Sequence, residues 1–343
     1  VPLGIGEGGK QIALDLHEKA HGPHGLVAGT TGSGKSELLQ SLILALAVHF
    51  SPREVGFVII DFKGGGMANQ FEKLPHMLGT ITNIDGRAMG RSLAPIKAEL
   101  TKRQRLFARE RVNSIDQYIE KYRSGAAPDP LPHLIIVVDE FAELKAEQPE
   151  FMKELISAAR IGRSLGVHLI LATQKPSGQV NDQIWSNSRF RICLKVATRE
   201  DSQEMIKSPA AFAIKEPGRA YLQVGNNEVF ELFQSGYSGG RTAGGATQLE
   251  AVVERVARYC AEQGIGRLPS ICLPPLPERI GYVPSPAPAG GDIRVCLGRY
   301  DSPADQSQGD VTVNLSQENV LIVGSPQYGK TNVLQTILRS GCE

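Results

Sequence analysis

Residues 29–36 of the chain read GTTGSGKS, which fits the pattern G-x-x-x-x-G-K-[ST] of a phosphate-binding loop, or P-loop. Its glycines let backbone N–H groups turn toward phosphate oxygens, and the helix expected to follow directs the positive end of its dipole at the same anion. We expect Lys35 to reach the β- and γ-phosphates of a nucleotide and Ser36 to ligate Mg²⁺. The residues predicted to bind nucleotide are Gly29, Thr30, Thr31, Gly32, Ser33, Gly34, Lys35 and Ser36.

Short apolar runs on both sides of this loop indicate the fold class. They are continuously apolar rather than alternating, which is typical of strands covered by helices on both faces of a sheet. Amphipathic stretches expected to be helical separate them. The pattern predicts an α/β fold, a doubly wound and mostly parallel sheet with helices on both faces. The predicted strands are 26–28, 55–60, 134–138, 167–172, 192–196 and 220–224, and the predicted helices are 37–50, 86–123 and 151–165.

An acidic pair, Asp139 and Glu140, directly follows the apolar run 134–138. A strand that delivers such a pair at its carboxyl end is the Walker B arrangement of nucleotide hydrolases. Asp139 is then expected to hold Mg²⁺, directly or through water, and Glu140 to act as the general base that polarises the attacking water. The alternative is an acid pair that faces solvent at a strand end, and the P-loop upstream argues against it.

Two further strand ends carry polar residues. The run 167–172 leads into Thr173 and Gln174, and an amide there suits a sensor between the two Walker motifs, with an ordinary strand-end amide as the alternative. The segment 61–66, DFKGGG, follows another predicted strand. Because ligands gather outside the carboxyl ends of strands, this segment either borders the nucleotide or the translocated substrate, or is a flexible turn.

Two arginines, Arg189 and Arg191, lie beside the run 192–196 with no acidic residue near them in the sequence. An unpaired arginine at such a place can project into the nucleotide of a neighbouring subunit and stabilise charge in the transition state. We assign this role in trans to Arg191 first and Arg189 second. The alternative is a plain surface arginine.

Composition limits the class of protein. The chain has 343 residues, 41% hydrophobic and 21% charged, as in soluble globular proteins. Its 37 Lys and Arg against 36 Asp and Glu argue against a surface devoted to nucleic acid. Five scattered cysteines fit reduced thiols in a cytosolic protein, and the histidines show no metal-binding pattern. No apolar run reaches the roughly 20 residues of a membrane span, although the chain fits a piece of a longer, membrane-anchored polypeptide.

The opening of the chain recurs near its end. Residues 324–331 read GSPQYGKT, a second P-loop match, and an apolar run precedes it as one precedes the first. We predict a complete unit over 1–240, a linker over 241–291 with one helix at about 248–262 and a Pro-rich extended part, and the truncated start of a second unit over 292–343. The second match predicts phosphate contacts from Gly324, Gly329, Lys330 and Thr331, but no second acidic strand end follows it within the chain.

Together these motifs resemble the FtsK/SpoIIIE branch of the RecA-like ATPases. The strings VDEFAEL at 138–144 and LILATQKP at 169–176 are close to that family's core. The strings DFKGG at 61–65, RFRICLK at 189–195 and PGRAYLQVG at 217–225 resemble the EccC/EssC group of type VII secretion ATPases, with the EssC form nearer. The resemblance covers residues 1–237 and resumes at about residue 292.

This resemblance implies a RecA-like P-loop fold, ATP and Mg²⁺ as cofactors, and a hexameric ring in which an arginine completes the neighbour's site. It also implies the cytoplasmic portion of a bacterial membrane-anchored protein with several ATPase domains. Its partners would be the membrane components of type VII secretion, and its cargo WXG-type helical proteins. This chain would be the middle ATPase domain and the start of the C-terminal one.

Two alternatives remain open at this point. One is a DNA translocase of the same family, against which the net charge of +1 argues. The other is an assembly module that binds ATP with little turnover, against which the intact Glu140 argues.

Overall fold

The computed structural model describes residues 1–343 except 62–65, 83–88, 181, 283–291 and 343. The chain divides into two compact units, Val1–Cys272 and Leu273–Glu343. Each unit builds its own sheet, of ten strands in the first and two in the second.

The first sheet has the strand order β2-β1-β10-β9-β8-β3-β7-β6-β4-β5. Its part from β8 to β5 is parallel, and β9, β10, β1 and β2 extend it with antiparallel pairing. The predicted mostly parallel sheet is therefore confirmed, with an antiparallel extension that was not predicted. Its strands are β1 (Pro2–Gly6), β2 (Gln11–Ala13), β3 (His24–Ala28), β4 (Val55–Asp61), β5 (Met77–Thr82), β6 (His133–Asp139), β7 (Val167–Thr173), β8 (Ser188–Cys193), β9 (Arg219–Val224) and β10 (Val229–Ser235).

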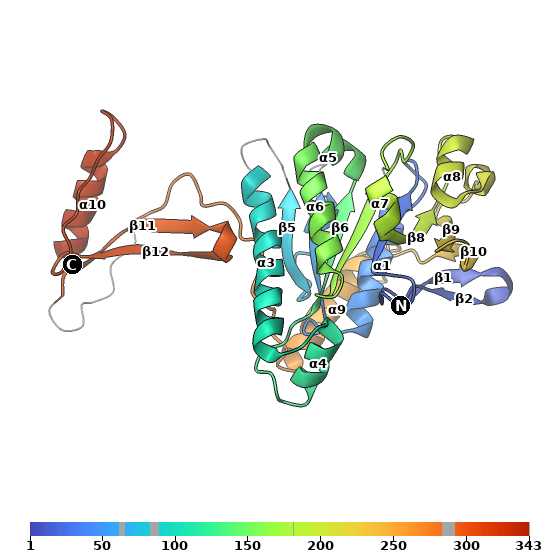
Figure 1. Ribbon diagram of the computed structural model, residues 1–343, viewed down its shortest axis with the longest axis horizontal. Helices are drawn as coiled ribbons and strands as arrows, with labels where there is room; N and C mark the ends of the chain where they lie inside the picture. Colours follow the sequence, from blue (N-terminus) through green and yellow to red (C-terminus); the bar gives the residue numbers. More distant parts are fainter. Residues whose placement is uncertain (62–65, 83–88, 181, 283–291, 343) are drawn as a thin grey trace. The chain divides into compact units, whose positions relative to one another are not determined.

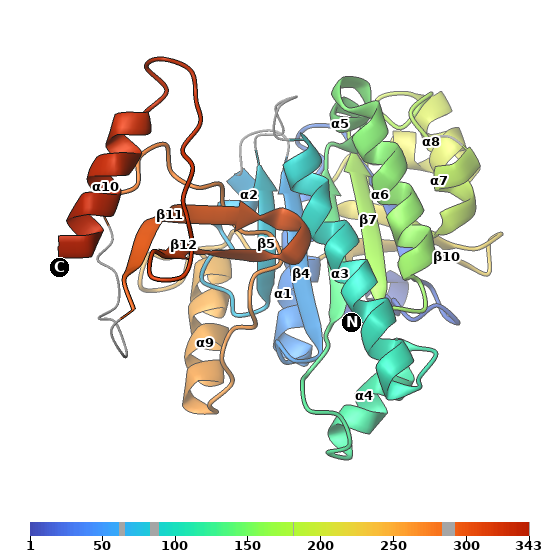
Figure 2. The same cartoon turned by 60° about the vertical axis from the view of Figure 1, so that its left-hand side comes forward.

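Helices cover both faces of this sheet, as the continuous apolar strands require (Figure 1). One buried cluster joins β-strand side chains to α3, α4, α5, α6, α7 and α8, and a second joins the opposite face to α1, α2 and α9. Figure 2 shows α3 and α6 on one side of the sheet and α1 and α9 on the other. The helical segments are α1 (Lys35–His49), α2 (Gly66–Asn69), α3 (Met89–Glu110), α4 (Ile115–Arg123), α5 (Phe141–Glu147), α6 (Pro149–Gly162), α7 (Asp182–Asn187), α8 (Arg199–Ile206) and α9 (Gln248–Glu262), with 3-10 turns η1 (Glu7–Gly9) and η2 (Pro209–Ala213).

The single helix predicted over 86–123 is two helices in the structure. The chain turns at Arg111, where φ is +56°, and α4 begins after Ser114, whose side chain accepts a hydrogen bond from the Gln117 N–H. One arginine of α3 lies in the interior instead of in solvent. Arg103 is completely buried, bonded to Glu99 at 2.9 Å and to two backbone carbonyls at 2.8 Å.

The helix predicted within a linker is part of the first unit instead. Leu249 and Val253 of α9 are buried in the cluster that contains α1. The chain then returns to the sheet edge, where the Ile271 N–H donates to the Leu78 carbonyl of β5 at 2.7 Å. The first unit therefore ends at Cys272 rather than near residue 240, because apolar burial continues past the glycine-rich stretch.

The second unit contains a hairpin and a helix. Its described elements are β11 (Arg294–Ser302), η3 (Pro303–Asp305), β12 (Ser307–Asn314) and α10 (Lys330–Cys342). The apolar run before the second P-loop is not a strand, and Leu321 and Val323 are 86% and 82% exposed. Among the helices of the described residues, none is long and apolar enough to cross a bilayer.

Candidate active site

The first P-loop lies where three adjacent parallel strands end. It leaves β3 after Ala28, and the neighbouring strands hold its first residues. The Gly29 N–H donates to the Thr173 carbonyl of β7 at 3.1 Å, and the Thr30 N–H donates to the Lys195 carbonyl just after β8 at 2.9 Å. The sheet therefore fixes the loop from both sides before α1 begins at Lys35.

The P-loop also contacts Gly218, which lies in the segment 217–225 singled out by its resemblance, although the sequence did not predict this contact. The Gly218 N–H donates to the Ser33 carbonyl at 2.8 Å. A Cβ on Gly34 would lie 2.6 Å from that same Gly218 nitrogen, and the φ of Gly34 is +92°. Glycine at position 34 is thus required both by the backbone conformation and by the close approach of residue 218.

The interior of the loop fits a phosphate group. The Ser33 Oγ is buried and has no hydrogen-bond partner among the described residues, and a Cβ on Gly29 would lie 2.5 Å from it. A cradle of this shape, closed by α1, leaves room for anionic oxygens and offers them donors.

Lys35 meets the acidic pair across the sheet. Its Nζ lies 2.5 Å from Asp139 Oδ1 and 3.7 Å from Glu140 Oε2, and its side chain is only 6% exposed. The pair arrives from β6, which is separated from β3 by β7 alone. The structure therefore brings together the lysine and both carboxylates that the sequence singled out.

Glu140 is held in an unusual conformation. Its φ of +57° and ψ of +55° place it in the left-handed region at the start of α5. Its Oε1 accepts hydrogen bonds from Thr173 Oγ1 at 2.9 Å and from the Gln174 N–H at 3.1 Å. Such backbone strain in a non-glycine residue persists only where surrounding contacts enforce it, and it gathers at functional sites.

Gln174 connects the two Walker motifs. Its side-chain Oε1 accepts a hydrogen bond from Thr31 Oγ1 of the P-loop at 2.9 Å, while its backbone N–H bonds Glu140. Two hydrogen bonds, both made by Gln174, therefore link the P-loop to the candidate base Glu140.

The donor set suits Mg²⁺. The ion keeps several waters and binds proteins through one or two carboxylates together with substrate phosphates. Ser36 is exposed on the first turn of α1, and Asp139 ends β6 on the same edge of the sheet. Across the described ranges no group of three or more His, Cys, Asp or Glu side chains is placed to hold a metal.

Asp61 ends β4 directly beside Asp139 in the sheet register and is buried. Its Oδ2 accepts the Met67 N–H at 3.0 Å, which fixes the start of α2. Residues 62–65 of the glycine-rich segment, predicted to border the nucleotide or substrate, lie outside the described residues.

The two candidate arginines lie on β8 with partners in their own chain. Arg189 pairs with Glu228 at 2.8 Å, so it has the acidic partner that the local sequence does not show. Arg191 stacks on the Trp185 ring at 4.6 Å and donates to Gln223 Oε1 at 3.2 Å. Desolvation by burial lowers the pKa of Arg191, although a guanidinium stays charged at neutral pH.

The second P-loop match lies in the other unit. Lys330 Nζ bonds the carbonyls of Gly324 at 2.5 Å and Ser325 at 3.3 Å, both in its own loop. Gly329 has a φ of +84°, and Thr331 lies in the first turn of α10.

A P-loop at the end of a central parallel strand, with its lysine paired to an acidic residue at the end of a second strand, defines a P-loop NTPase of the RecA-like class. Residues 1–178 match the FtsK/SpoIIIE family, so the chain belongs to that family. Its first unit is an ATPase domain of this kind.

Known relatives point to one branch of the family. The chain is 48% identical to the type VII secretion system protein EssC of Staphylococcus aureus and 51% identical to the ESX secretion system protein EccC of Geobacillus thermodenitrificans, over 98% and 99% of its length. It covers 26% and 25% of those proteins, about a quarter of each. Its structure matches the cytoplasmic domain of the type VII secretion ATPase EccC of Thermomonospora curvata with a TM-score of 0.84 at 33% identity, covering 99% of this chain and 42% of that one.

Proposed function

We propose that the chain is an ATP-hydrolysing motor domain of a type VII secretion ATPase. The observation that carries the proposal is the contact of Lys35 with Asp139 and Glu140. It occurs in a chain that resembles secretion proteins along nearly its whole length.

Each residue of the site has a distinct task in this proposal. The P-loop N–H groups and Lys35 bind the β- and γ-phosphates of ATP, and Ser36 and Asp139 hold Mg²⁺. The ion, when bound, neutralises charge that develops on the phosphate oxygens. Glu140 accepts a proton from the attacking water.

The lysine couples binding to activation of the base. Lys35 lies against both carboxylates, and phosphate oxygens compete for the same ammonium group. When Lys35 turns to the phosphate, Glu140 Oε2 loses a cation 3.7 Å away, and the carboxylate can turn to the attacking water. Gln174 is hydrogen-bonded to both Thr31 and Glu140, so a movement of the P-loop on nucleotide binding also shifts Glu140.

Assembly completes the site. Hydrolysis needs a positive charge beside the transferred phosphoryl group. In this proposal an arginine of a neighbouring subunit supplies that charge. Because Arg191 would act on a neighbour's nucleotide, an isolated subunit turns over slowly and a ring turns over faster; within its own chain Arg191 stacks on Trp185. Arg189, paired with Glu228, is the second candidate.

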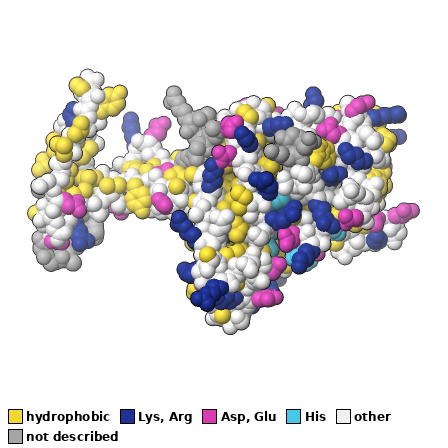
Figure 3. Space-filling model, viewed as in Figure 1, with side chains coloured by type: hydrophobic (Ala, Val, Ile, Leu, Met, Phe, Trp, Pro, Cys, Tyr) yellow, Lys and Arg dark blue, Asp and Glu magenta, His cyan; other side chains and the backbone are white. Residues whose placement is uncertain are grey.

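In the cell this domain belongs to the cytoplasmic portion of a membrane-anchored, hexameric protein with further ATPase domains. Its partners are the membrane components of type VII secretion, and its cargo is WXG-type helical proteins. Basic and acidic side chains are interspersed over the first unit in the face shown in Figure 3, which disfavours DNA as cargo.

The test compares ATP turnover per subunit in the free chain and in the chain fused to a hexamer-forming scaffold. We expect turnover to rise on ring formation, Arg191→Ala to remove the rise, and Arg189→Ala to leave most of it. An Arg191→Ala ring as fast as the parental ring overturns the trans assignment. Stimulation by duplex DNA, steeply reduced by salt, and none by cargo protein would favour the DNA translocase instead.

A further inference from the structure

A large cavity lies at the end of the sheet opposite to the P-loop. Its volume is about 640 Å³, within the usual range for ligand pockets. It is bordered by the first residues of β4, β6 and β7, by the end of α1, by α4, and by the segment that links β2 to β3. The P-loop follows the carboxyl end of β3 and these borders lie at amino ends of parallel strands, so the cavity is separate from the nucleotide site.

The cavity combines apolar walls with a predominantly acidic lining. Leu14, Leu46 and Ile135 are among its apolar lining residues, all buried. Four carboxylates line it, and the one lining guanidinium, Arg123, is bonded to one of them, Glu54, at 2.7 Å. The backbone of Val1 also borders the cavity, and its nitrogen donates to the Leu14 carbonyl. The lining carboxylates are Asp15, Glu54, Asp116 and Glu120.

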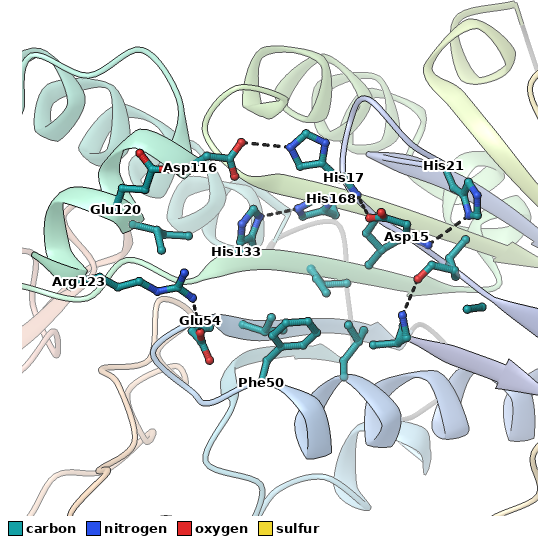
Figure 4. A pocket seen from close by; sticks show the side chains of 18 residues that line it. Asp15, His17, His21, Phe50, Glu54, Asp116, Glu120, Arg123, His133 and His168 are labelled. Atoms are coloured by element: carbon teal, nitrogen blue, oxygen red, sulfur yellow. Dashed lines mark hydrogen bonds and ion pairs between the residues drawn. The ribbon is translucent and has the colours of Figure 1, made fainter.

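A chain of two imidazoles determines which atom faces the cavity (Figure 4). His168 Nδ1 lies 3.2 Å from the Pro23 carbonyl, which only accepts, so His168 carries its proton on Nδ1. Burial lowers the pKa of His168 well below its ordinary value, which keeps the ring neutral and its Nε2 an acceptor. His133 Nδ1, 2.9 Å from that Nε2, must therefore donate.

This arrangement makes His133 Nε2 a hydrogen-bond acceptor that faces the cavity. Burial, with a smaller contribution from Arg103, lowers the pKa of His133 to about 4, so this ring is also neutral at pH 7. With its proton on Nδ1, His133 presents the lone pair of Nε2 to the cavity that it lines. A ligand there must bring a hydrogen-bond donor rather than an acceptor.

We propose that this cavity binds a basic side chain, lysine or arginine, supplied by a partner polypeptide. The alkyl stem packs against Leu14, Leu46 and Ile135, and the charged head donates to His133 Nε2 and to the carboxylate of Glu120. Besides the pairs Glu54–Arg123 and Asp116–His17, the lining carries the carboxylates of Asp15 and Glu120, so charge complementarity favours a cation. The volume exceeds that of one such side chain, which leaves space for its flanking residues and favours a peptide over a small free amine.

The test measures binding of the labelled pentapeptide Gly-Leu-Arg-Leu-Gly by fluorescence polarisation. The control peptide carries citrulline, which keeps the shape of arginine but not its charge. We expect the arginine peptide to bind at least tenfold tighter, since a hydrogen bond to a charged group is worth more than a neutral one. Equal affinity for the two peptides overturns the proposal, as does tighter binding of a peptide with glutamate in place of arginine.

Two variants localise the binding. His133→Phe keeps a ring but removes the acceptor, and we expect roughly a tenfold loss. Glu120→Gln, on an exposed helix face that tolerates change, is expected to cost about threefold, with Glu262→Gln on α9 as the matched control that changes nothing. Unaltered affinity in both cavity variants overturns the site. Agmatine, a free guanidinium on an alkyl stem, binding as tightly as the peptide would assign the cavity to small amines and overturn the polypeptide partner.

Discussion

Two segments of this molecule carry the same loop pattern in different surroundings. In residues 29–36 and 324–331 the glycine before the lysine has nearly the same φ, +92° at Gly34 and +84° at Gly329. A helix begins at the lysine in both, at Lys35 and at Lys330. Eight residues are therefore enough to specify the shape of the loop.

The surroundings decide what each loop can do. The first follows β3, whose residues are all buried, and its lysine reaches Asp139 on another strand. The second follows an exposed segment, and its lysine bonds only the carbonyls of its own loop among the described residues. Local sequence makes a phosphate-sized loop, whereas the chemistry of hydrolysis comes from strands far away in the chain.

Glu140→Gln tests whether hydrolysis at the first loop depends on a residue at the end of a distant strand. It has the largest expected effect. Loss of the general base should reduce ATP turnover by about 10²–10³-fold while nucleotide binding is kept. Glu147→Gln, an exposed substitution on the same helix, is the control and should leave turnover unchanged. A Glu140→Gln chain that hydrolyses ATP at the parental rate would show that another group is the base.

The pH dependence of unfolding separates the two units, because all seven histidines lie in the first. Burial lowers the pKa of His24 and His133 from 6.5 to about 4. Below pH 6.5 the unfolded chain binds protons that the folded unit does not, so the free energy of unfolding falls as the pH drops toward 4. At about 1.4 kcal/mol per pKa unit, each of these histidines accounts for about 3 kcal/mol.

Urea unfolding followed by the fluorescence of Trp185, the single tryptophan, reports this loss for the first unit. His133→Phe should make the decline between pH 6.5 and 4 shallower, and His49→Gln, at an exposed position, should not. Equal unfolding free energies at pH 7 and pH 4.5 would contradict the burial of neutral histidines.

Alanine at the two equivalent glycines measures the bracing of the first loop. Both positions have a positive φ, which disfavours alanine by roughly 1–2 kcal/mol. At Gly34 the new Cβ would also lie 2.6 Å from the Gly218 backbone nitrogen, whereas at Gly329 it meets nothing within 4 Å. We expect Gly34→Ala to destabilise the Trp185 transition by about 2–3 kcal/mol and Gly329→Ala to leave it unchanged. A Gly34→Ala chain as stable as the parent would remove Gly218 as a brace.

Much of the site was predictable from the sequence, for a physical reason. A P-loop and a strand-end acid pair are local patterns, and parallel strands bring their carboxyl ends to one edge, so the sequence could predict that Lys35, Asp139, Glu140 and Gln174 lie together. The contact of Gly218 with Ser33 was not predicted. It depends on the path of the backbone just before β9, which no local pattern in the sequence specifies.

Contacts that depend on strand pairing could not be predicted from the sequence either. Glu228 reaches Arg189 only because β8 and β9 pair in antiparallel fashion, 39 residues apart in the chain. His133 and His168 lie at the starts of two neighbouring strands, so no spacing in the sequence shows that they meet. Glu99 and Arg103 form a buried ion pair four residues apart on α3, and nothing in the local sequence shows that it is buried.

The most direct test of the central claim is nucleotide binding by two matched variants, Lys35→Ala and Lys330→Ala. Equilibrium dialysis with a slowly hydrolysed ATP analogue and Mg²⁺ gives the number of tight sites per chain. We expect one tight site, lost by at least about 100-fold in affinity in Lys35→Ala and unchanged in Lys330→Ala, because in the described part of the chain Lys35 follows a buried strand and reaches distant carboxylates and Lys330 does not. Two tight sites in the parental chain, or an equal loss in both variants, would contradict it.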